Sequence, residues 1–235
     1  MNHGVVFALV LAWPGAALAE EFTVSPTSGN SGFAAVFDDA LGELNVAVSS
    51  SIECALTFDE GAGTVSGRCA VPLTSVRVDN NDAKTGHFRQ WVTNNQSDPK
   101  HCAFEAVFRE VKVGKLVAEK PVPFTGEVVM TVCGRSRVDG GTEKLSGAAL
   151  LFPPTLFRER RAIRIRAVIA TFHRDAYHID PKYTEGWLAR LESLADVVAE
   201  WGSIDLSLFA EAAERGTAAL AASPAPESKV EGDAR

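Results

Sequence analysis

Short segments of alternating apolar and polar residues, separated by turn residues, constrain the fold of this chain more than any other feature. The clearest are Leu44 to Val48, Ile52 to Phe58, Val65 to Leu73, Cys102 to Val111, Gly126 to Cys133 and Ile163 to Phe172. Alternation with a period of two is typical of strands that bury one face, and residues 22 to 179 show almost no helical periodicity. The pattern predicts a mainly β protein, either a barrel or a sandwich. A polar and aromatic segment from Ala83 to Val92 predicts a turn of helix or an ordered loop.

The first nineteen residues have the features of a secretory signal peptide. Gly4 to Leu11 is an apolar run, Pro14 and Gly15 break it, and Ala17-Leu18-Ala19 has the small-x-small form of a cleavage site. The run is too short to span a bilayer, and no Cys follows it directly, so we expect neither a transmembrane helix nor a lipoprotein anchor. The sequence therefore predicts a periplasmic or secreted protein that begins at Glu20, with an uncleaved N-terminal anchor as the alternative.

The expected export favours two disulfides among the four cysteines, Cys54, Cys69, Cys102 and Cys133. Their spacings are also too wide for the paired cysteines of a zinc knuckle. Three connectivities are possible. A hairpin folded about Gly61 and Ala62 places Cys54 opposite Cys69 on the apolar face, which favours that pair. The remaining pair, Cys102 and Cys133, has conflicting strand parity and requires a bulge or an irregular strand end.

The C-terminal part of the chain changes period. Trp187, Leu188, Leu191, Leu194, Ala195 and Val198 recur at intervals of three and four, which predicts a helix from Thr184 to a stop at Gly202. A second helix is expected from about Ser203 to Leu220. The expected divisions are therefore a signal peptide (1–19), a β-domain (20–181), a helical extension (182–222) and a disordered tail (223–235). We expect the acidic helices to pack on the β-domain or on a partner, such as a second subunit.

Charge and motifs exclude several functional classes. The chain has 23 Lys and Arg against 30 Asp and Glu, a net charge of −7, which argues against nucleic-acid binding. His173, Asp175 and Tyr177 share one strand face, yet no second cluster supplies further metal ligands or acid-base partners. No nucleophile elbow or phosphate loop is present. We therefore expect a protein without enzymatic activity, a metal site or a cofactor.

One basic cluster runs from Arg158 to Arg166. Its members are Arg158, Arg160, Arg161, Arg164 and Arg166. A solvated strand edge is the simplest interpretation, and a site for an anionic headgroup or a partner is the alternative.

Several motifs resemble the YceI-like family. The run Val71-Pro72-Leu73-Thr74-Ser75-Val76 is followed by Asp82-Ala83-Lys84-Thr85-Gly86-His87-Phe88-Arg89, and the segments Gly126 to Gly134, Phe152-Pro153 and Ala170 to Ile179 also resemble family elements. The resemblance covers roughly Phe22 to Asp180. It implies an extended antiparallel, lipocalin-like β-barrel that holds a polyisoprenoid or quinone-like lipid, in a protein that is often periplasmic.

The sequence also departs from the family pattern. His178 stands where family members usually have Gly, and Asp175 lies one place before their acidic residue. The family turn reads Gly134-Arg135-Ser136-Arg137 here, and cysteine pairs are not a general family feature.

Ligand-binding candidates follow from strand face and side-chain chemistry. The interior candidates are Phe58, Phe104, Phe108, Met130 and Ile165, those at the barrel mouth are Phe88 and Trp91, and those for a polar headgroup are His87 and Arg89. Inward Phe and Met side chains pack cores as well as ligands, and His87 has a loop backbone as an alternative partner. Two hypotheses remain, an exported carrier of an isoprenoid lipid and a secreted structural or interaction module with a filled barrel.

Overall fold

The structure is a computed structural model, and it describes residues 19–28, 30–39, 42–94, 98–156, 158–179 and 198–213. The proposed signal peptide, apart from Ala19, lies outside these residues. The strands are β1 (Glu20–Val24), β2 (Gly32–Asp39), β3 (Leu44–Ser49), β4 (Glu53–Asp59), β5 (Thr64–Pro72), β6 (Arg77–Val78), β7 (Ala103–Lys112), β8 (Val122–Val132), β9 (Arg135–Ser136), β10 (Glu143–Phe152), β11 (Ala162–His173) and β12 (Val198–Ala212). An α-helix, α1 (Asp82–Thr93), and the short 3-10 helices η1 (Pro26–Ser28), η2 (Leu73–Ser75), η3 (Pro99–His101) and η4 (Arg174–Tyr177) complete the described elements.

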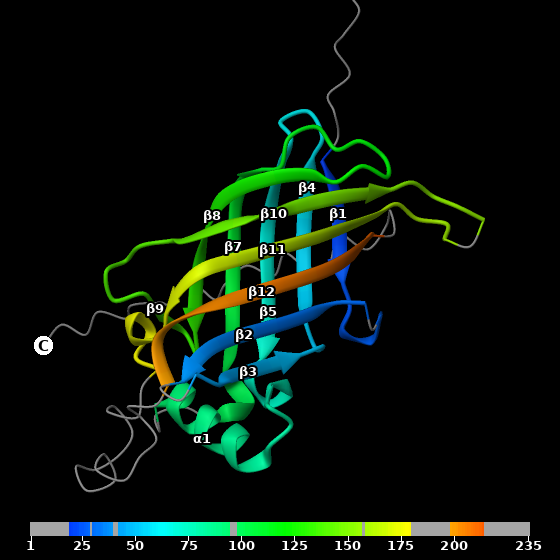
Figure 1. Cartoon of the computed structure of the whole chain (residues 1–235). Coiled ribbons are helices and arrows are strands. Elements are labelled where there is room, and N and C mark those ends of the chain that lie inside the picture. The colour runs from blue at the N-terminus through cyan, green and yellow to red at the C-terminus, as the bar shows by residue number, and fades with distance from the viewer. Residues whose placement is uncertain are drawn as a thin grey trace, which may run out of the picture.

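Eight antiparallel strands close into a barrel in the order β1-β4-β5-β7-β8-β10-β11-β12, because β1 pairs with both β4 and β12. Beyond the point where β1 ends, β2 takes its place beside β12, and β3 and β6 extend the sheet from there. Figure 1 shows α1 at this end of the molecule, below β2 and β3. The expectation of an antiparallel β-barrel is confirmed.

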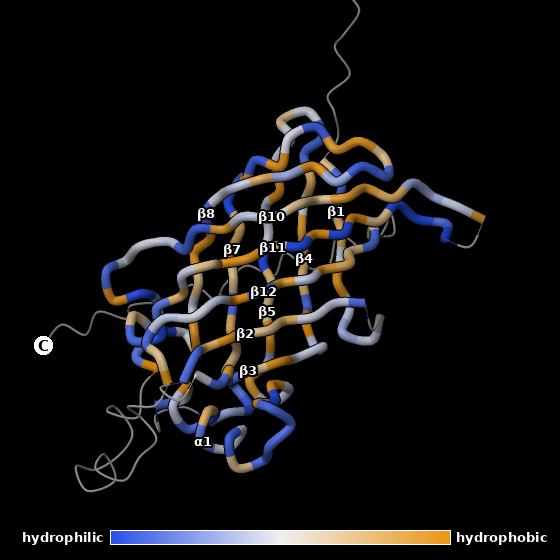
Figure 2. Tube along the Cα trace, viewed as in Figure 1, coloured by the Kyte–Doolittle hydropathy of each residue, from blue (hydrophilic) through white to orange (hydrophobic). Residues whose placement is uncertain are grey.

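The alternation that predicted strands also builds the interior. Apolar and polar residues alternate along the strands (Figure 2), and the apolar members point into the barrel. Phe22, Phe58 and Leu208 are each at most 2% exposed. The expected strands between Leu44 and Phe172 are all present, with ends shifted by at most four residues.

The segment expected as a turn of helix or a loop is a three-turn helix. Asn81 caps the start of α1, because its side chain accepts a hydrogen bond from the Lys84 N–H at 3.0 Å. Asn94 ends it in the left-handed conformation, with φ +54°. Thr85 fixes the helix to the sheet, since its hydroxyl accepts the Val78 N–H at 3.0 Å.

Both expected disulfides are present. Cys54 and Cys69 are direct partners in the β4–β5 register, as the hairpin argument required. Cys102 is bonded to Cys133, and the parity conflict is resolved by the irregular strand end that the sequence demanded. Cys133 follows the last residue of β8 with φ +49°, while its N–H still donates to the Ala103 carbonyl at 2.9 Å.

The predicted C-terminal helical extension is wrong where the structure describes it. Residues expected to end one helix and begin another form β12, which closes the barrel. Spacings of three among Leu206, Phe209 and Ala212 favoured a helix, but an alternating set is the one that is buried. Its members are Ile204, Leu206, Leu208, Ala210 and Ala212. Burial in the sheet therefore overrides a helical pattern built from good helix formers.

The β-domain consequently extends past residue 181, and residues 198–212 offer no helical surface to a partner. Most of the expected helix from Thr184 to Gly202, the end of the second one and the expected tail lie outside the described residues. Within the described ranges, no helix is long and apolar enough to cross a membrane.

Candidate functional site

A pocket of about 270 Å³ opens into the barrel at the end covered by α1. Its wall comes from β2, β3, β6, β7, β11 and β12, and one face of α1 forms its cover. The lining residues are Ala35, Phe37, Asp39, Glu43, Asn45, Ala47, Val78, Lys84, His87, Phe88, Trp91, Phe104, Phe172, Arg174, Ile179, Val198 and Ile204. Most of them are apolar, so the pocket suits an apolar guest.

Two alanines create much of this space. Ala35 on β2 pairs directly with Ala47 on β3, and its other neighbour in the sheet is Ile204 on β12. Both alanines are buried, at 4% and 3% exposed. Larger side chains at this pair of inward positions would fill the space that these two leave open.

The cover is an amphipathic face of α1. Lys84, His87, Phe88 and Trp91 follow the i, i+3, i+4, i+7 spacing that aligns side chains on one side of a helix. The Phe88 ring stacks on Phe104 at 6.2 Å between centroids, which continues the apolar wall from the helix into the sheet. The indole N–H of Trp91 is buried and has no hydrogen-bond partner among the described residues.

The mouth of the pocket is polar. Lys84 Nζ lies 2.7 Å from the Asp79 carboxylate and 3.3 Å from the Asn45 side-chain oxygen. Burial opposes ionisation of Asp79, but hydrogen bonds from Lys84 and from the Val46 N–H outweigh it and lower its pKa. The same contact with Asp79 raises the pKa of Lys84. The ammonium is therefore already paired, while the acidic residues Asp39 and Glu43 also stand at this mouth.

Arg174 forms a buried polar corner of the pocket, at 5% exposed. Its guanidinium donates to the carbonyls of Ala199, Ile179 and Val198, each at 3.0 Å. These bonds hold the chain before and after the undescribed residues 180–197 to the barrel end. The Arg174 side chain thus fixes this wall of the pocket.

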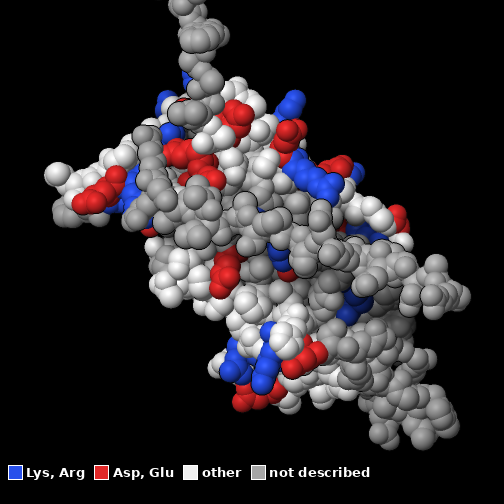
Figure 3. Space-filling model, turned by 180° about the vertical axis from the view of Figure 1, so that it is seen from behind, with Lys and Arg blue, Asp and Glu red and all other residues white. Residues whose placement is uncertain are grey.

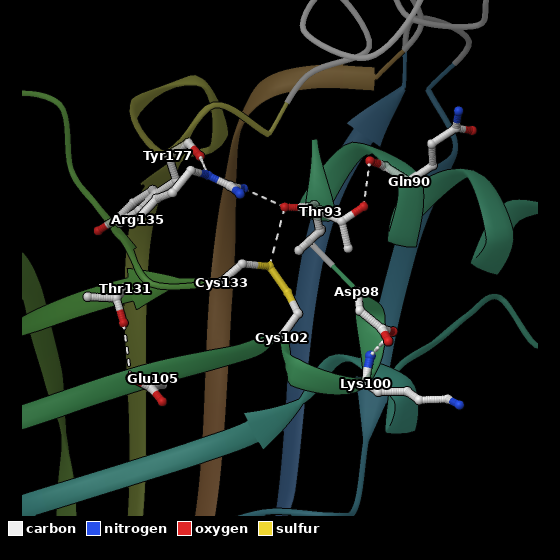
Figure 4. The surroundings of a disulfide bond; sticks show 11 residues. Gln90, Thr93, Asp98, Lys100, Cys102, Glu105, Thr131, Cys133, Arg135 and Tyr177 are labelled. Atoms are coloured by element: carbon white, nitrogen blue, oxygen red, sulfur yellow. Dashed lines mark hydrogen bonds between the residues drawn. A yellow bond between two sulfur atoms is a disulfide. The ribbon is translucent and has the colours of Figure 1, made fainter. Parts of the chain in front are cut away.

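The Cys102–Cys133 disulfide holds the end of α1 in place (Figure 4). Cys133 Sγ lies in contact with the Val92 carbonyl oxygen, at 3.4 Å, and this oxygen accepts a hydrogen bond from Arg135 Nη2. Arg135 Nε donates to the Tyr177 carbonyl at 3.0 Å, and burial lowers the Arg135 pKa. The disulfide and Arg135 together connect the cover to β8 and to η4.

The structure brings four of the nine predicted ligand-binding residues to the pocket: His87, Phe88, Trp91 and Phe104. Arg89 lies on another side of α1, and its Nη2 donates to the Thr74 and Val76 carbonyls at 2.6 and 3.1 Å. The other four are buried elsewhere in the barrel and do not line the pocket. They are Phe58, Phe108, Met130 and Ile165, all at most 7% exposed.

Sequence reasoning missed the pocket walls on β2, β3 and β12. The alternation of Phe33, Ala35 and Phe37 was available as a signal for β2, and the helical spacing from Lys84 to Trp91 was available for the cover. The space itself had no signal, because inward alanines at 35 and 47 become neighbours only once the β2–β3 register is known.

The polar side chains of His173 and Tyr177, which the sequence placed on one strand face, do not meet at one site. His173 stacks on Trp201 at 4.3 Å, whereas the Tyr177 hydroxyl is buried and donates to Glu143 at 2.7 Å. No group of His, Cys, Asp and Glu in the described ranges has a metal-binding arrangement.

The arginines of the cluster from Arg158 to Arg166 have separate partners and do not form one site. Arg158 lies over the Phe152 ring at 5.1 Å, Arg161 pairs with Glu20 at 2.8 Å, and Arg164 reaches Ser207 at 3.4 Å. Seen from behind, Lys and Arg side chains lie beside Asp and Glu side chains (Figure 3). The described residues in this view therefore present charges of both signs, rather than the continuous basic face that binding to phosphate backbones requires.

Comparison with known proteins supports the fold. No family and no curated protein matches the sequence. Among solved structures, the chain is similar to a polyisoprenoid-binding domain from Saccharophagus degradans implicated in plant cell wall breakdown. The two share 14% sequence identity with a TM-score of 0.53, over 83% of this chain and 100% of that domain. At this identity the likeness establishes a common barrel fold, and the ligand has to be argued from the pocket.

Proposed function

We propose that this protein is an exported lipid-binding protein of the YceI-like family, which carries or sequesters an isoprenoid lipid in the pocket under α1. The observation that carries the proposal is an apolar pocket at one end of a barrel whose fold is shared with a polyisoprenoid-binding domain. Burial of an apolar chain contributes about 0.8 kcal/mol per methylene, so binding needs no catalytic group. We propose no enzymatic activity, metal or cofactor.

The polar groups of the pocket favour a lipid with an uncharged oxygen-bearing head, such as an alcohol or a quinone. The Trp91 indole N–H lacks an acceptor among the described residues, and a hydroxyl or carbonyl oxygen would supply one. An anionic head would meet Asp39 and Glu43, while Lys84 is already paired with Asp79 and the Arg174 guanidinium donates to three backbone carbonyls. A neutral head avoids that repulsion.

The two disulfides support the proposal that the protein is exported. Two disulfides with no free cysteine among the described residues are typical of proteins from oxidising compartments. The N-terminal signal sequence would direct the chain there, and the barrel would begin at Glu20.

The second candidate, a structural module with a filled barrel, is favoured by the packed half of the interior around Phe22 and Phe58. Lipid extraction separates the two. The protein is purified from the periplasm or culture medium, extracted with organic solvent, and analysed by mass spectrometry, with a parallel titration of prenols and short quinones. We expect a co-purifying or added isoprenoid at near one equivalent. Repeated absence of both would leave the filled-barrel module as the function.

A further inference from the structure

We infer that the pocket buries only about ten carbon atoms, or two isoprene units, of an isoprenoid ligand, so that affinity stops rising steeply with chain length beyond geraniol. This inference rests on the proposed function and sets a limit on chain length within it. Its basis is the division of the barrel into a hollow half under α1 and a filled half beyond it.

The volume of the pocket limits the length of lipid chain that it can bury. An engineered apolar cavity of about 150 Å³ holds one benzene ring of six carbons. By proportion, a pocket of about 270 Å³ holds roughly ten to eleven carbons. A long polyisoprenoid would have to leave most of its chain in water or displace the packed interior.

A floor of large side chains closes the pocket toward the filled half. On β2, Ala35 and Phe37 line the pocket, and the next inward residue, Phe33, does not. Phe33 is 3% exposed, lies 5.5 Å from the Phe104 ring and pairs in register with Leu206 of β12. On β12, Ile204 lines the pocket, but the next inward residue, Leu206, does not and is 8% exposed.

Beyond this floor, the described residues leave no continuation of the pocket. Phe22, Leu56 and Phe58 on β1 and β4 are at most 4% exposed, and Val128 and Leu208 are each 1% exposed. Lengthening the pocket through this layer would require several core side chains to leave their positions, since protein interiors are close-packed.

The test is a competition among prenols of increasing length on the full protein. Dimethylallyl alcohol, geraniol, farnesol and geranylgeraniol, with five, ten, fifteen and twenty carbons, are offered as an equimolar mixture and the bound fraction is measured by mass spectrometry. Each buried carbon should raise affinity roughly fourfold. We expect geraniol to exceed dimethylallyl alcohol by at least about a hundredfold, and the longer prenols to gain less than about tenfold over geraniol.

A rise of about tenfold or more from geraniol to geranylgeraniol would overturn the length limit and leave the proposed function intact. Binding of no prenol at any length would instead overturn the proposed function. The two failures are therefore distinguishable in one experiment.

A floor variant supplies a second, independent readout. Phe33→Leu should change the length preference by raising the affinity for farnesol relative to geraniol by about tenfold or more, because a smaller floor residue deepens the pocket. Phe58→Leu, a matched change in the filled half, should leave the preference unchanged. Equal shifts in both variants would contradict the assignment of Phe33 as the floor, and if neither folds, the series on the unaltered protein still decides.

Discussion

Ala35 and Ala47 stand directly opposite each other in the register of β2 and β3, and both line the pocket. The neighbouring inward residues on β2 are Phe33 and Phe37, which are bulky and buried. The hollow therefore arises from two small side chains placed side by side in a wall of large ones.

Replacing one of these alanines should fill the pocket. We expect Ala47→Leu to weaken isoprenoid binding by at least about tenfold, because its side chain would occupy space that the ligand needs. The free energy of unfolding should stay within about 1 to 2 kcal/mol of the parent, since the added methyl groups enter an existing void. Titration with geraniol and urea denaturation measure the two effects.

Ala34→Leu is the matched control, because Ala34 lies on the neighbouring strand β2 with its side chain on the face opposite that of Ala35. It should bind geraniol as the parent does. Equal loss of binding in both variants would show that the effect is not pocket filling.

The fold was predictable to the extent that local alternation decided it. Strands from Leu44 to Phe172 and the Cys54–Cys69 register followed from face and turn chemistry alone. β12 was not predictable in this way, because Leu206, Phe209 and Ala212 satisfy a helical spacing and only pairing with β11 and β1 reveals the buried alternate set. The pocket depends on the same long-range register, so aromatic side chains were identified as its lining while Ala35 and Ala47 were not.

The Cys102–Cys133 disulfide should stabilise the cover as well as the fold. Replacing both cysteines with alanine is expected to lower the free energy of unfolding by about 3 to 4 kcal/mol, on loop-closure grounds. Because Cys133 and Arg135 both lie against the Val92 carbonyl, amide hydrogen exchange in α1 should also accelerate. Urea denaturation and exchange mass spectrometry of residues 82–93 measure these effects.

The Cys54→Ala/Cys69→Ala variant provides the comparison. That bridge joins β4 to β5, and neither cysteine lines the pocket or lies beside α1. It should lose a similar stability, about 3 kcal/mol, with little local change in α1 exchange. Faster exchange in α1 to the same extent in both variants would refute the specific role of Cys102–Cys133.

Trp91 should report on occupancy of the pocket. Its indole lines the pocket, whereas Trp201 is 57% exposed and stacks on His173 away from the lining. We expect geraniol to change the intrinsic fluorescence, and this change to disappear in Trp91→Phe and persist in Trp201→Phe. A ligand-dependent signal that is lost only in Trp201→Phe would place the lipid elsewhere.

Tyr177 should make stability fall at high pH. Burial, followed by its hydrogen bond to Glu143, raises the pKa of the Tyr177 hydroxyl above its usual value of about 10. Above that pH the unfolded chain releases the hydroxyl proton while the folded chain keeps it. The contribution of Tyr177 to the free energy of unfolding is therefore complete below about pH 10. It declines as the pH rises further, by at most about 1.4 kcal/mol per pH unit. Tyr177→Phe should cost about 1 to 2 kcal/mol at neutral pH, because Glu143 loses one donor and keeps Arg137 at 2.7 Å. Urea midpoints between pH 8 and 11 should show the two proteins converging as pH rises, and a constant difference across that range would exclude Tyr177 as the titrating group.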